Sequence, residues 1–381
     1  MTPSGRLAAL VLVLAGLLSV TPALAQSLGR GRAMFGGFES RTYRFSAPLP
    51  VEGISQVAIP AGAMVSLGRV TVDIGGYWAA TTRTRRGGGF RRVTGLTDTQ
   101  ARVAVVLGRD LLVASLVANL PTGRDRMDPL DFDVLGAVSS SFLAFPVNAY
   151  ANGASLTGAL AGVMTAGAWN VGLAASLRAS REFTPVVDPV AGPLTYRAGT
   201  EGRLRIGADR LVGQGRVAAA LTVSSFGDDS YSGLGAVRGA YQPGVRWIGE
   251  AMTTVPAAGG TITGTLWGYR RSAGDTAGVS LGNAESLAGM TLSGAWPVSV
   301  GMDLEPGLEL RYSGVEGGSG LLGGGGLGLR ARLRPGLSAW SGVRYDLGYL
   351  DARSFDDEGQ PEVSRTRIRT WYLSAFLRIS R

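Results

Sequence analysis

The residues best suited to chemistry in this 381-residue chain are charged side chains on alternate positions of two apolar segments, 298–312 and 328–349. They are Asp303, Glu305, Glu309, Arg311, Arg330, Arg332, Arg344 and Asp346. A period of two places such residues on one face of a β-strand and the apolar residues between them on the other. Facing carboxylates and guanidinium groups predict either a charge ladder across a lumen that sets ion selectivity, or structural ion pairs that keep a polar interior satisfied.

The same charged residues give little support for catalysis. The chain has no histidine and no cysteine, which removes the most common general base, the thiolate nucleophile and the usual transition-metal ligands. Asp303 and Glu305 leave a carboxylate-pair hydrolase formally open, but two residues on one strand face stand about 7 Å apart and nothing marks a sugar-binding cleft. From the sequence we expect a protein that is not an enzyme, with no cofactor and no metal.

A second group of candidate residues lies in the long connection 122–153. Asp125, Asp128, Asp131 and Asp133 precede a segment that contains Phe142 and Phe145. The aspartates could hold a divalent cation, yet their spacing fits no standard loop, so a solvated acidic loop is expected. The segment 137–147 is either part of a strand or an apolar piece that folds into a barrel mouth, where Phe142 and Phe145 contact cargo.

The elements that position these residues are alternating strands. In 328–349 two such strands, each about a dozen residues long, flank the turn Arg334-Pro335-Gly336, in which proline presets φ and glycine accepts a left-handed conformation. Strands of about 9–11 tilted residues suit a bilayer core, and only helices and closed barrels satisfy every backbone polar group in lipid. We therefore predict an all-β, transmembrane, antiparallel β-barrel whose polar face lines a lumen.

Short and long connections alternate along the chain, with short turns at 166–167, 213–215, 257–260, 296–297 and 335–336 and long polar connections between them. This bias is typical of bacterial outer-membrane barrels, whose periplasmic turns are short and whose outer loops are long. Counting segments gives about 14 strands, within a range of 14–16. Even numbers are favoured because single-chain bacterial barrels have them.

The chain begins with features of export. Arg6, the apolar stretch 7–20 and Ala23-Leu24-Ala25 predict a cleaved signal peptide at 1–25. Residues 26–53 are predicted to be an N-terminal arm, either a plug or a first strand, and 54–381 the barrel. The location predicted is the outer membrane of a Gram-negative cell.

Two short stretches resemble a known family. The run Gly95-Leu96-Thr97-Asp98-Thr99-Gln100 is followed by a strand, a tight turn, a second strand and Asn119-Leu120-Pro121-Thr122-Gly123. This pattern resembles a signature of the long-chain fatty-acid transporter superfamily, in its branch associated with aromatic-compound degradation. The resemblance implies a barrel of fourteen strands with an N-terminal plug that admits hydrophobic molecules.

The remaining expectations concern partners. The formal charge is +9, carried by arginines that are spread over the strands rather than gathered, so nucleic-acid binding is not expected. The last segment, 371–380, resembles the terminal strand by which the barrel-assembly machinery recognises its substrates, although the chain ends in Arg381. The function predicted is passive uptake of small hydrophobic molecules. The alternatives are a structural or adhesive barrel without cargo, and a general diffusion porin.

Overall fold

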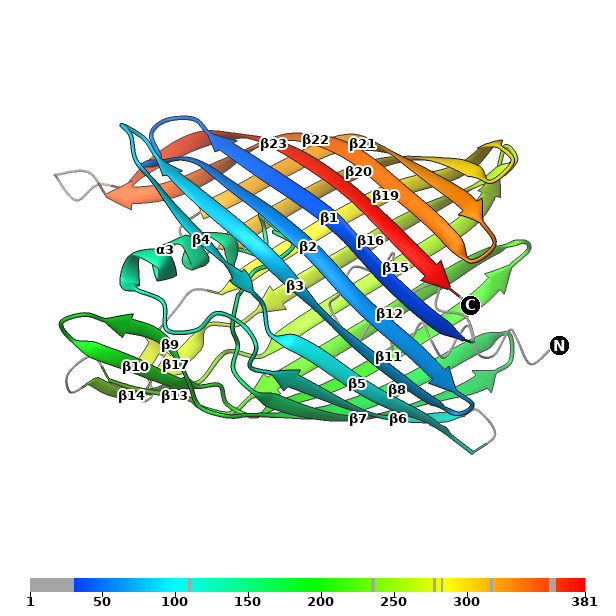
Figure 1. Ribbon diagram of the computed structural model, residues 1–381, viewed down its shortest axis with the longest axis horizontal. Helices are drawn as coiled ribbons and strands as arrows, with labels where there is room; N and C mark the ends of the chain where they lie inside the picture. The colour runs from blue at the N-terminus through cyan, green and yellow to red at the C-terminus, as the bar shows by residue number, and fades with distance from the viewer. Residues whose placement is uncertain are drawn as a thin grey trace.

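A closed antiparallel barrel forms the body of the protein in the computed structural model (Figure 1). The structure describes residues 31–108, 111–233, 237–276, 279–281, 284–315, 318–355 and 361–380. The predicted signal peptide, 1–25, lies outside the described residues. The strands of the wall are β1 (Arg32–Phe45), β2 (Val51–Leu67), β3 (Val70–Arg85), β4 (Phe90–Leu96), β5 (Thr99–Leu107), β6 (Leu112–Leu120), β7 (Ser155–Ala166), β8 (Trp169–Ser180), β11 (Glu201–Val212), β12 (Gly215–Phe226), β15 (Arg246–Ala257), β16 (Gly260–Arg271), β19 (Glu285–Ser299), β20 (Met302–Val315), β21 (Gly318–Arg334), β22 (Leu337–Phe355) and β23 (Pro361–Ser380).

The barrel closes between its first and last strands, because β1 pairs along its length with β23, from Ala33 opposite Ser380 to Phe45 opposite Ile368. β4 and β5 pair with successive parts of β3 and together occupy one place in the wall. The described wall therefore has 16 strands rather than about 14. One of the added strands is β1, which lies in the arm predicted at 26–53 to be a plug or a first strand.

The two ends of the barrel differ. The connections after β2, β7, β11, β15, β19 and β21 have two residues each, at 68–69, 167–168, 213–214, 258–259, 300–301 and 335–336. The turn predicted at 296–297 is at 300–301 because β19 runs on to Ser299. All these turns lie at the end where β1 begins and β23 ends (Figure 1). The long connections lie at the other end, as in outer-membrane barrels.

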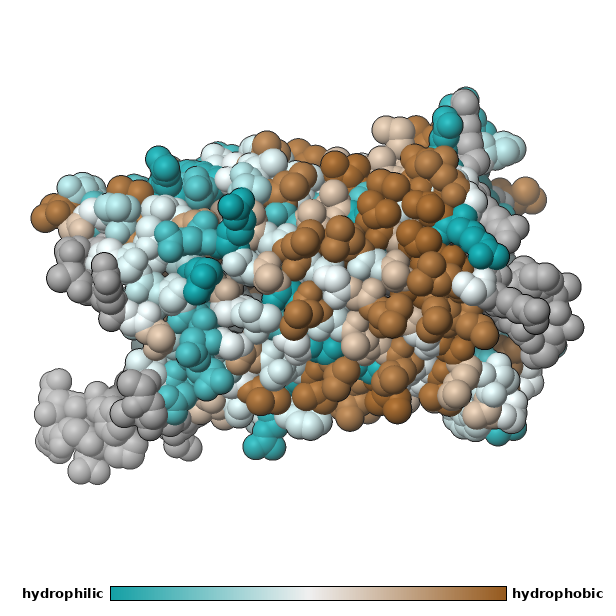
Figure 2. All heavy atoms as spheres, turned by 90° about the horizontal axis from the view of Figure 1, so that it is seen from below, coloured by the Kyte–Doolittle hydropathy of each residue, from teal (hydrophilic) through white to brown (hydrophobic). Residues whose placement is uncertain are grey.

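The outer surface carries an apolar belt. Leucines at alternate positions of neighbouring strands point outward and are more than half exposed, as at Leu173, Leu204 and Leu308. Figure 2 shows these apolar side chains gathered toward the end with the short turns, and hydrophilic residues over the opposite end. Exposing so much apolar surface to water would be costly, whereas lipid accepts it. The chain is thus a transmembrane barrel of the outer-membrane kind. The described residues contain no helix with the length and hydrophobicity of a membrane span.

Beyond the wall, the long connections carry structure of their own. A four-stranded sheet is built from β9 (Phe183–Asp188), β10 (Gly192–Arg197), β13 (Asp229–Gly233) and β14 (Val237–Tyr241). A small pair is formed by β17 (Gly274–Thr276) and β18 (Val279–Leu281). The helix α3 (Pro129–Val138) lies at the same end, inside the outline of the barrel (Figure 1).

Candidate functional site

The connection between β6 and β7, residues 121–154, begins at a polar joint made by the two stretches of the family-like pattern. Asp98, which is 8% exposed, accepts hydrogen bonds from Gly123 N at 3.0 Å, Asn119 Nδ2 at 2.9 Å and Asn152 N at 2.7 Å. A Cβ on Gly123 would lie 2.0 Å from the carbonyl oxygen of Tyr150, so only glycine fits there. The joint therefore ties the beginning of the connection to its end.

The helix α3 follows the joint. Asp128 caps it, because the Asp128 Oδ1 accepts from Asp131 N at 2.7 Å and Pro129 provides a favourable first residue. Asp131 is 4% exposed and receives Arg91 Nε and Arg124 Nη2 at 2.6 Å each. Three further ion pairs hold the helix, from Asp128 to Arg91 and from Asp133 to Arg83 and Arg85.

These contacts correct one expectation. The aspartates at 128, 131 and 133 do not form a solvated acidic loop, because arginines of β3, β4 and the connection itself neutralise them. Spacing along the chain cannot show such pairing, since Arg83 and Arg91 precede the helix by some 40 residues. Among the described residues, no group of acidic side chains is arranged to hold a metal ion.

After the helix the chain turns into the lumen, in a segment that we call the inner segment, residues 139–150. Its apolar side chains Phe142, Leu143 and Phe145 are buried against a wall cluster. The wall members of that cluster are Tyr43, Phe45, Ile54, Leu287, Leu322 and Ile368. The strand alternative for 137–147 is therefore wrong, and the segment folds inside the wall.

The backbone of the inner segment is held by polar side chains of the wall. Arg41 Nη1 and the Tyr43 hydroxyl both donate to the Leu143 carbonyl, the first at 3.1 Å, and Arg311 donates to the Phe142 carbonyl. Gln56, fully buried, donates to the Val147 carbonyl at 2.7 Å and accepts from Val147 N at 2.8 Å. An irregular backbone inside a barrel needs such partners because buried peptide groups are costly when unpaired.

The four predicted residues nearest this segment form one cluster. Glu309 and Arg311 on β20 pair at 2.5 Å, Arg344 and Asp346 on β22 pair at 2.6 Å, and Arg344 also reaches Glu309. Between them, β21 presents glycines inward, and a Cβ on Gly324 would lie 2.1 Å from the Tyr345 carbonyl oxygen. The arginine that pairs with Glu309 thus also anchors the inner segment.

The other four predicted charges lie nearer the short turns. Arg330 Nε lies 2.8 Å from Glu305 Oε1, and Trp340 Nε1 donates to Glu305 Oε2 at 2.8 Å. Asp303 stands opposite Arg330 in the register, and Arg332 follows on the same inward face. The predicted ladder therefore divides into two groups at different depths, and the second contacts no part of the inner segment.

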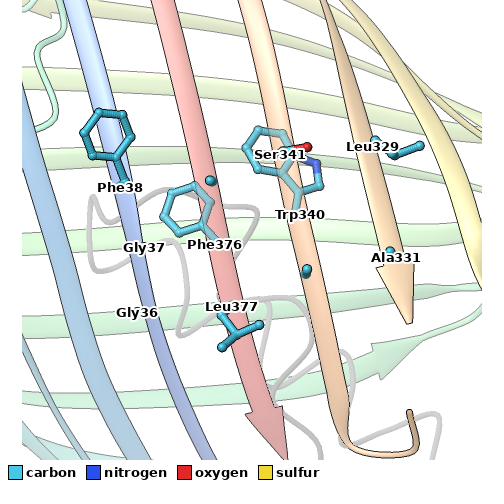
Figure 3. Close-up of a pocket in the computed structure, with 11 residues that line it drawn as sticks. Gly36, Gly37, Phe38, Leu329, Ala331, Trp340, Ser341, Phe376 and Leu377 are labelled. Atoms are coloured by element: carbon cyan, nitrogen blue, oxygen red, sulfur yellow. The ribbon is translucent and has the colours of Figure 1, made fainter. Parts of the chain in front are cut away.

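An apolar pocket lies on the outer side of the strands near this second group. Figure 3 shows Phe38, Phe376 and Trp340 on the adjacent strands β1, β23 and β22, with Leu329 and Leu377 beside them. The rings of Trp340 and Phe376 have centroids 5.7 Å apart. Its lining residues carry no charge, and Phe38 and Leu377 are exposed at outward positions, so this pocket belongs to the lipid-facing surface rather than to the lumen.

The residues that sequence reasoning did not select are Arg41, Tyr43 and Gln56. A signal was present, because Glu39, Arg41 and Tyr43 alternate with Phe38 and Ser40 in a strand pattern like the one at 328–349. The pattern by itself does not decide the matter, because 26–53 suits a plug as well as a first strand. Nothing local marks Gln56, whose partner Val147 is 91 residues away.

No known protein family and no curated protein matches the sequence. Among solved structures, outer-membrane expressed OmpT of Vibrio cholerae is 10% identical, with a TM-score of 0.42 over 93% of this chain and 99% of that one. An outer membrane channel from Pseudomonas putida F1 is 10% identical, with a TM-score of 0.37 over 91% and 97%. A mutant porin of Rh. blastica is 14% identical, with a TM-score of 0.32 over 92% and 100%.

These likenesses concern the fold alone, and the description of the barrel rests on its own pairing. They nevertheless correct one expectation. The conclusion that the chain is not an enzyme is overturned, because the structures it is similar to include OmpT together with a porin and a channel. One fold can host different functions, so neither the absence of histidine nor the barrel itself excludes catalysis.

Proposed function

We propose that this barrel is a passive channel for small molecules across the outer membrane, and that the inner segment sets its width. The observation that carries the proposal is the anchoring of 139–150 inside the wall by Arg41, Tyr43, Gln56 and Arg311. A barrel of 16 strands is wide enough to leave an aqueous lumen unless something fills part of it. A segment fixed to one side of the wall narrows such a lumen without a separate plug domain.

The cargo that we propose is a small molecule with an apolar body. The family-like pattern around Asp98 supports hydrophobic cargo of the kind handled by the fatty-acid transporter superfamily. Phe142 and Phe145 are only 4% and 6% exposed, so their burial supports a role in holding the inner segment to the wall rather than in contacting cargo. Half-buried Trp267 and Tyr269, which face inward from β16 and pack against the same cluster, are better placed to contact it.

Two partners belong to the same proposal. The exposed apolar belt supports contact with outer-membrane lipid. The role of β23 in closing the barrel against β1 supports recognition of that strand by the assembly machinery. Nothing in the distribution of arginines along the wall favours nucleic acid.

The test is single-channel conductance of the refolded protein in a planar bilayer, for the intact chain and for a deletion of 125–152. Heat-modifiable mobility in electrophoresis confirms that both barrels have folded. We expect steady conductance from the intact protein and a larger conductance after the deletion. Equal conductance would overturn the role of the inner segment. If neither folded protein conducts, the proposed channel function is refuted and the structural or adhesive alternative is favoured. A large, unselective conductance of the intact protein would favour a general porin.

A further inference from the structure

A row of arginines crosses the lumen wall at the end with the long connections. Arg178 on β8, Arg203 on β11, Arg246 on β15 and Arg271 on β16 all occupy inward positions. The register links them, because Arg178 stands opposite Glu201, Ser224 stands opposite both Arg203 and Arg246, and Arg246 stands opposite Arg271. Trp247, next to Arg246, points outward and is 47% exposed, as in the aromatic girdle at a membrane interface. The row therefore lies at the outer mouth of the channel.

Carboxylates neutralise this row only in part. Glu201 Oε1 receives Arg203 Nη2 at 2.7 Å and Arg246 Nη2 at 2.5 Å, so two guanidinium groups share one oxygen. Glu285 lies 3.5 Å from Arg271. Within the described residues, these ion pairs set two carboxylates against four arginines, an excess of 4 − 2 = +2. Like charges directly opposite each other on neighbouring strands are destabilising, so the pairing of Arg246 with Arg271 in the register is not explained by stability.

Arg246 contributes a buried donor to this row. The Arg246 Nε is buried and makes no hydrogen bond within the part of the chain that the structure describes. Buried donors are nearly always paired, by protein, water or ligand. The Arg246 guanidinium carbon also lies 5.2 Å from the centroid of the Phe226 ring, a cation–π contact.

The row borders an apolar surface. Tyr269 and Trp267 precede Arg271 on the inward face of β16, and Ile248 of β15 stands opposite Tyr269. Both aromatic side chains are half-buried and pack against the cluster that holds the inner segment. Positive charge and aromatic surface thus meet at one place on the wall.

We propose that this place binds small organic anions, whose carboxylate pairs with Arg246, Arg203 and Arg271 and whose apolar body lies against Tyr269 and Trp267. Guanidinium groups match carboxylates in geometry as well as in charge. An adjacent apolar wall then selects molecules that carry a ring or chain behind the anionic group. The inference rests on the proposed channel and names the class of cargo that it admits.

The test uses three probes in planar bilayers: benzoate, acetate with the same charge, and benzyl alcohol with a similar ring and no charge. Interruption of chloride current by added probe gives a half-blocking concentration for each. We expect benzoate to block at a concentration at least tenfold lower than acetate or benzyl alcohol. The variant Arg246→Gln should raise the benzoate value about tenfold, because it removes a charge-assisted hydrogen bond. Tyr269→Leu should raise the benzoate value and leave the acetate value unchanged.

The control is Arg216→Gln, since Arg216 faces the same lumen and pairs singly with Asp209 at 3.0 Å, nearer the short turns. It should leave the benzoate value within twofold of the wild type. Equal effects of Arg246→Gln and Arg216→Gln would overturn the local site and leave only a general positive lumen. If all three probes block at the same concentration, the proposal that the cargo is an organic anion with an apolar body is refuted. Absence of any conductance by folded wild-type protein would instead count against the channel itself.

Discussion

The anchoring of the inner segment by Gln56 gives the sharpest prediction. Gln56 is fully buried and joins Val147 through two hydrogen bonds of 2.7 and 2.8 Å, with a third to Thr81 Oγ1 at 2.9 Å. Gln56→Met keeps the size of the side chain and removes all three. Leaving the N–H and C=O of Val147 buried and unpaired costs about 1–3 kcal/mol for each group, so we expect the anchored state to lose about 2–6 kcal/mol.

That loss predicts a change in gating rather than in folding. A shift of about 2–6 kcal/mol changes an equilibrium constant roughly 30- to 25,000-fold. The wild type should rest in a low-conductance state, and Gln56→Met should show frequent transitions to a higher conductance close to that of the 125–152 deletion. Single-channel dwell times in a planar bilayer measure this change.

The matched control is Gln100→Met, because Gln100 is an amide on the wall strand β5 that is exposed rather than buried. It should gate like the wild type. If Gln56→Met folds normally, as shown by its electrophoretic mobility, and its dwell times equal those of Gln100→Met, then the inner segment is not held in the way described here.

Three further predictions concern folding and the outer connections. Gly324→Ala places a Cβ 2.1 Å from the Tyr345 carbonyl oxygen and should lower the refolded fraction seen by heat-modifiable mobility, whereas Gly249→Ala, with nothing within 4 Å, should refold like the wild type. Asp131→Asn breaks the pairing with Arg91 and Arg124 and should loosen α3 by about 1–3 kcal/mol, a figure reduced because both arginines are partly exposed. Limited trypsin digestion should then cut Asp131→Asn near Arg124 and Arg126 at least fivefold faster than it cuts the control variant Asp125→Asn, in which the lost carboxylate is an exposed one. Equal cleavage rates in the two variants would contradict the role of Asp131 in holding α3. Hydrogen bonds from the N–H groups of Ala191 and Val190 lower the pKa of Asp188. The carboxylate should therefore stay ionised, and the amides of its turn protected from exchange, at and above the ordinary pKa of an aspartate. As the pH falls through the lowered pKa, protonation of Asp188 should remove that protection. Asp188→Ala should show the unprotected exchange at every pH.

The sequence by itself determined the class of fold and the two faces of its strands. Alternation with period two needs no knowledge of neighbours, and it placed Glu309, Arg311, Arg344 and Asp346 on the inward face, where the structure has them. The bias between short and long connections is equally local, because a two-residue turn can be recognised from glycine and its flanking strands. The strand count is less secure, since β1 lies in the region 26–53, whose composition suits either a plug or a strand.

The tertiary structure alone decided what occupies the lumen. Folding of the inner segment depends on contacts such as Arg41 with Leu143 and Arg311 with Phe142, which are separated by 102 and 169 residues. The arginine row depends in the same way on register, which brings Arg178, Arg203, Arg246 and Arg271 to one height although no short motif contains them. A period of two shows which face a residue takes but not how far along the barrel axis it lies, because that depth is fixed by strand tilt and stagger around the closed sheet. The site of this protein is therefore a property of the closed barrel and not of any single segment.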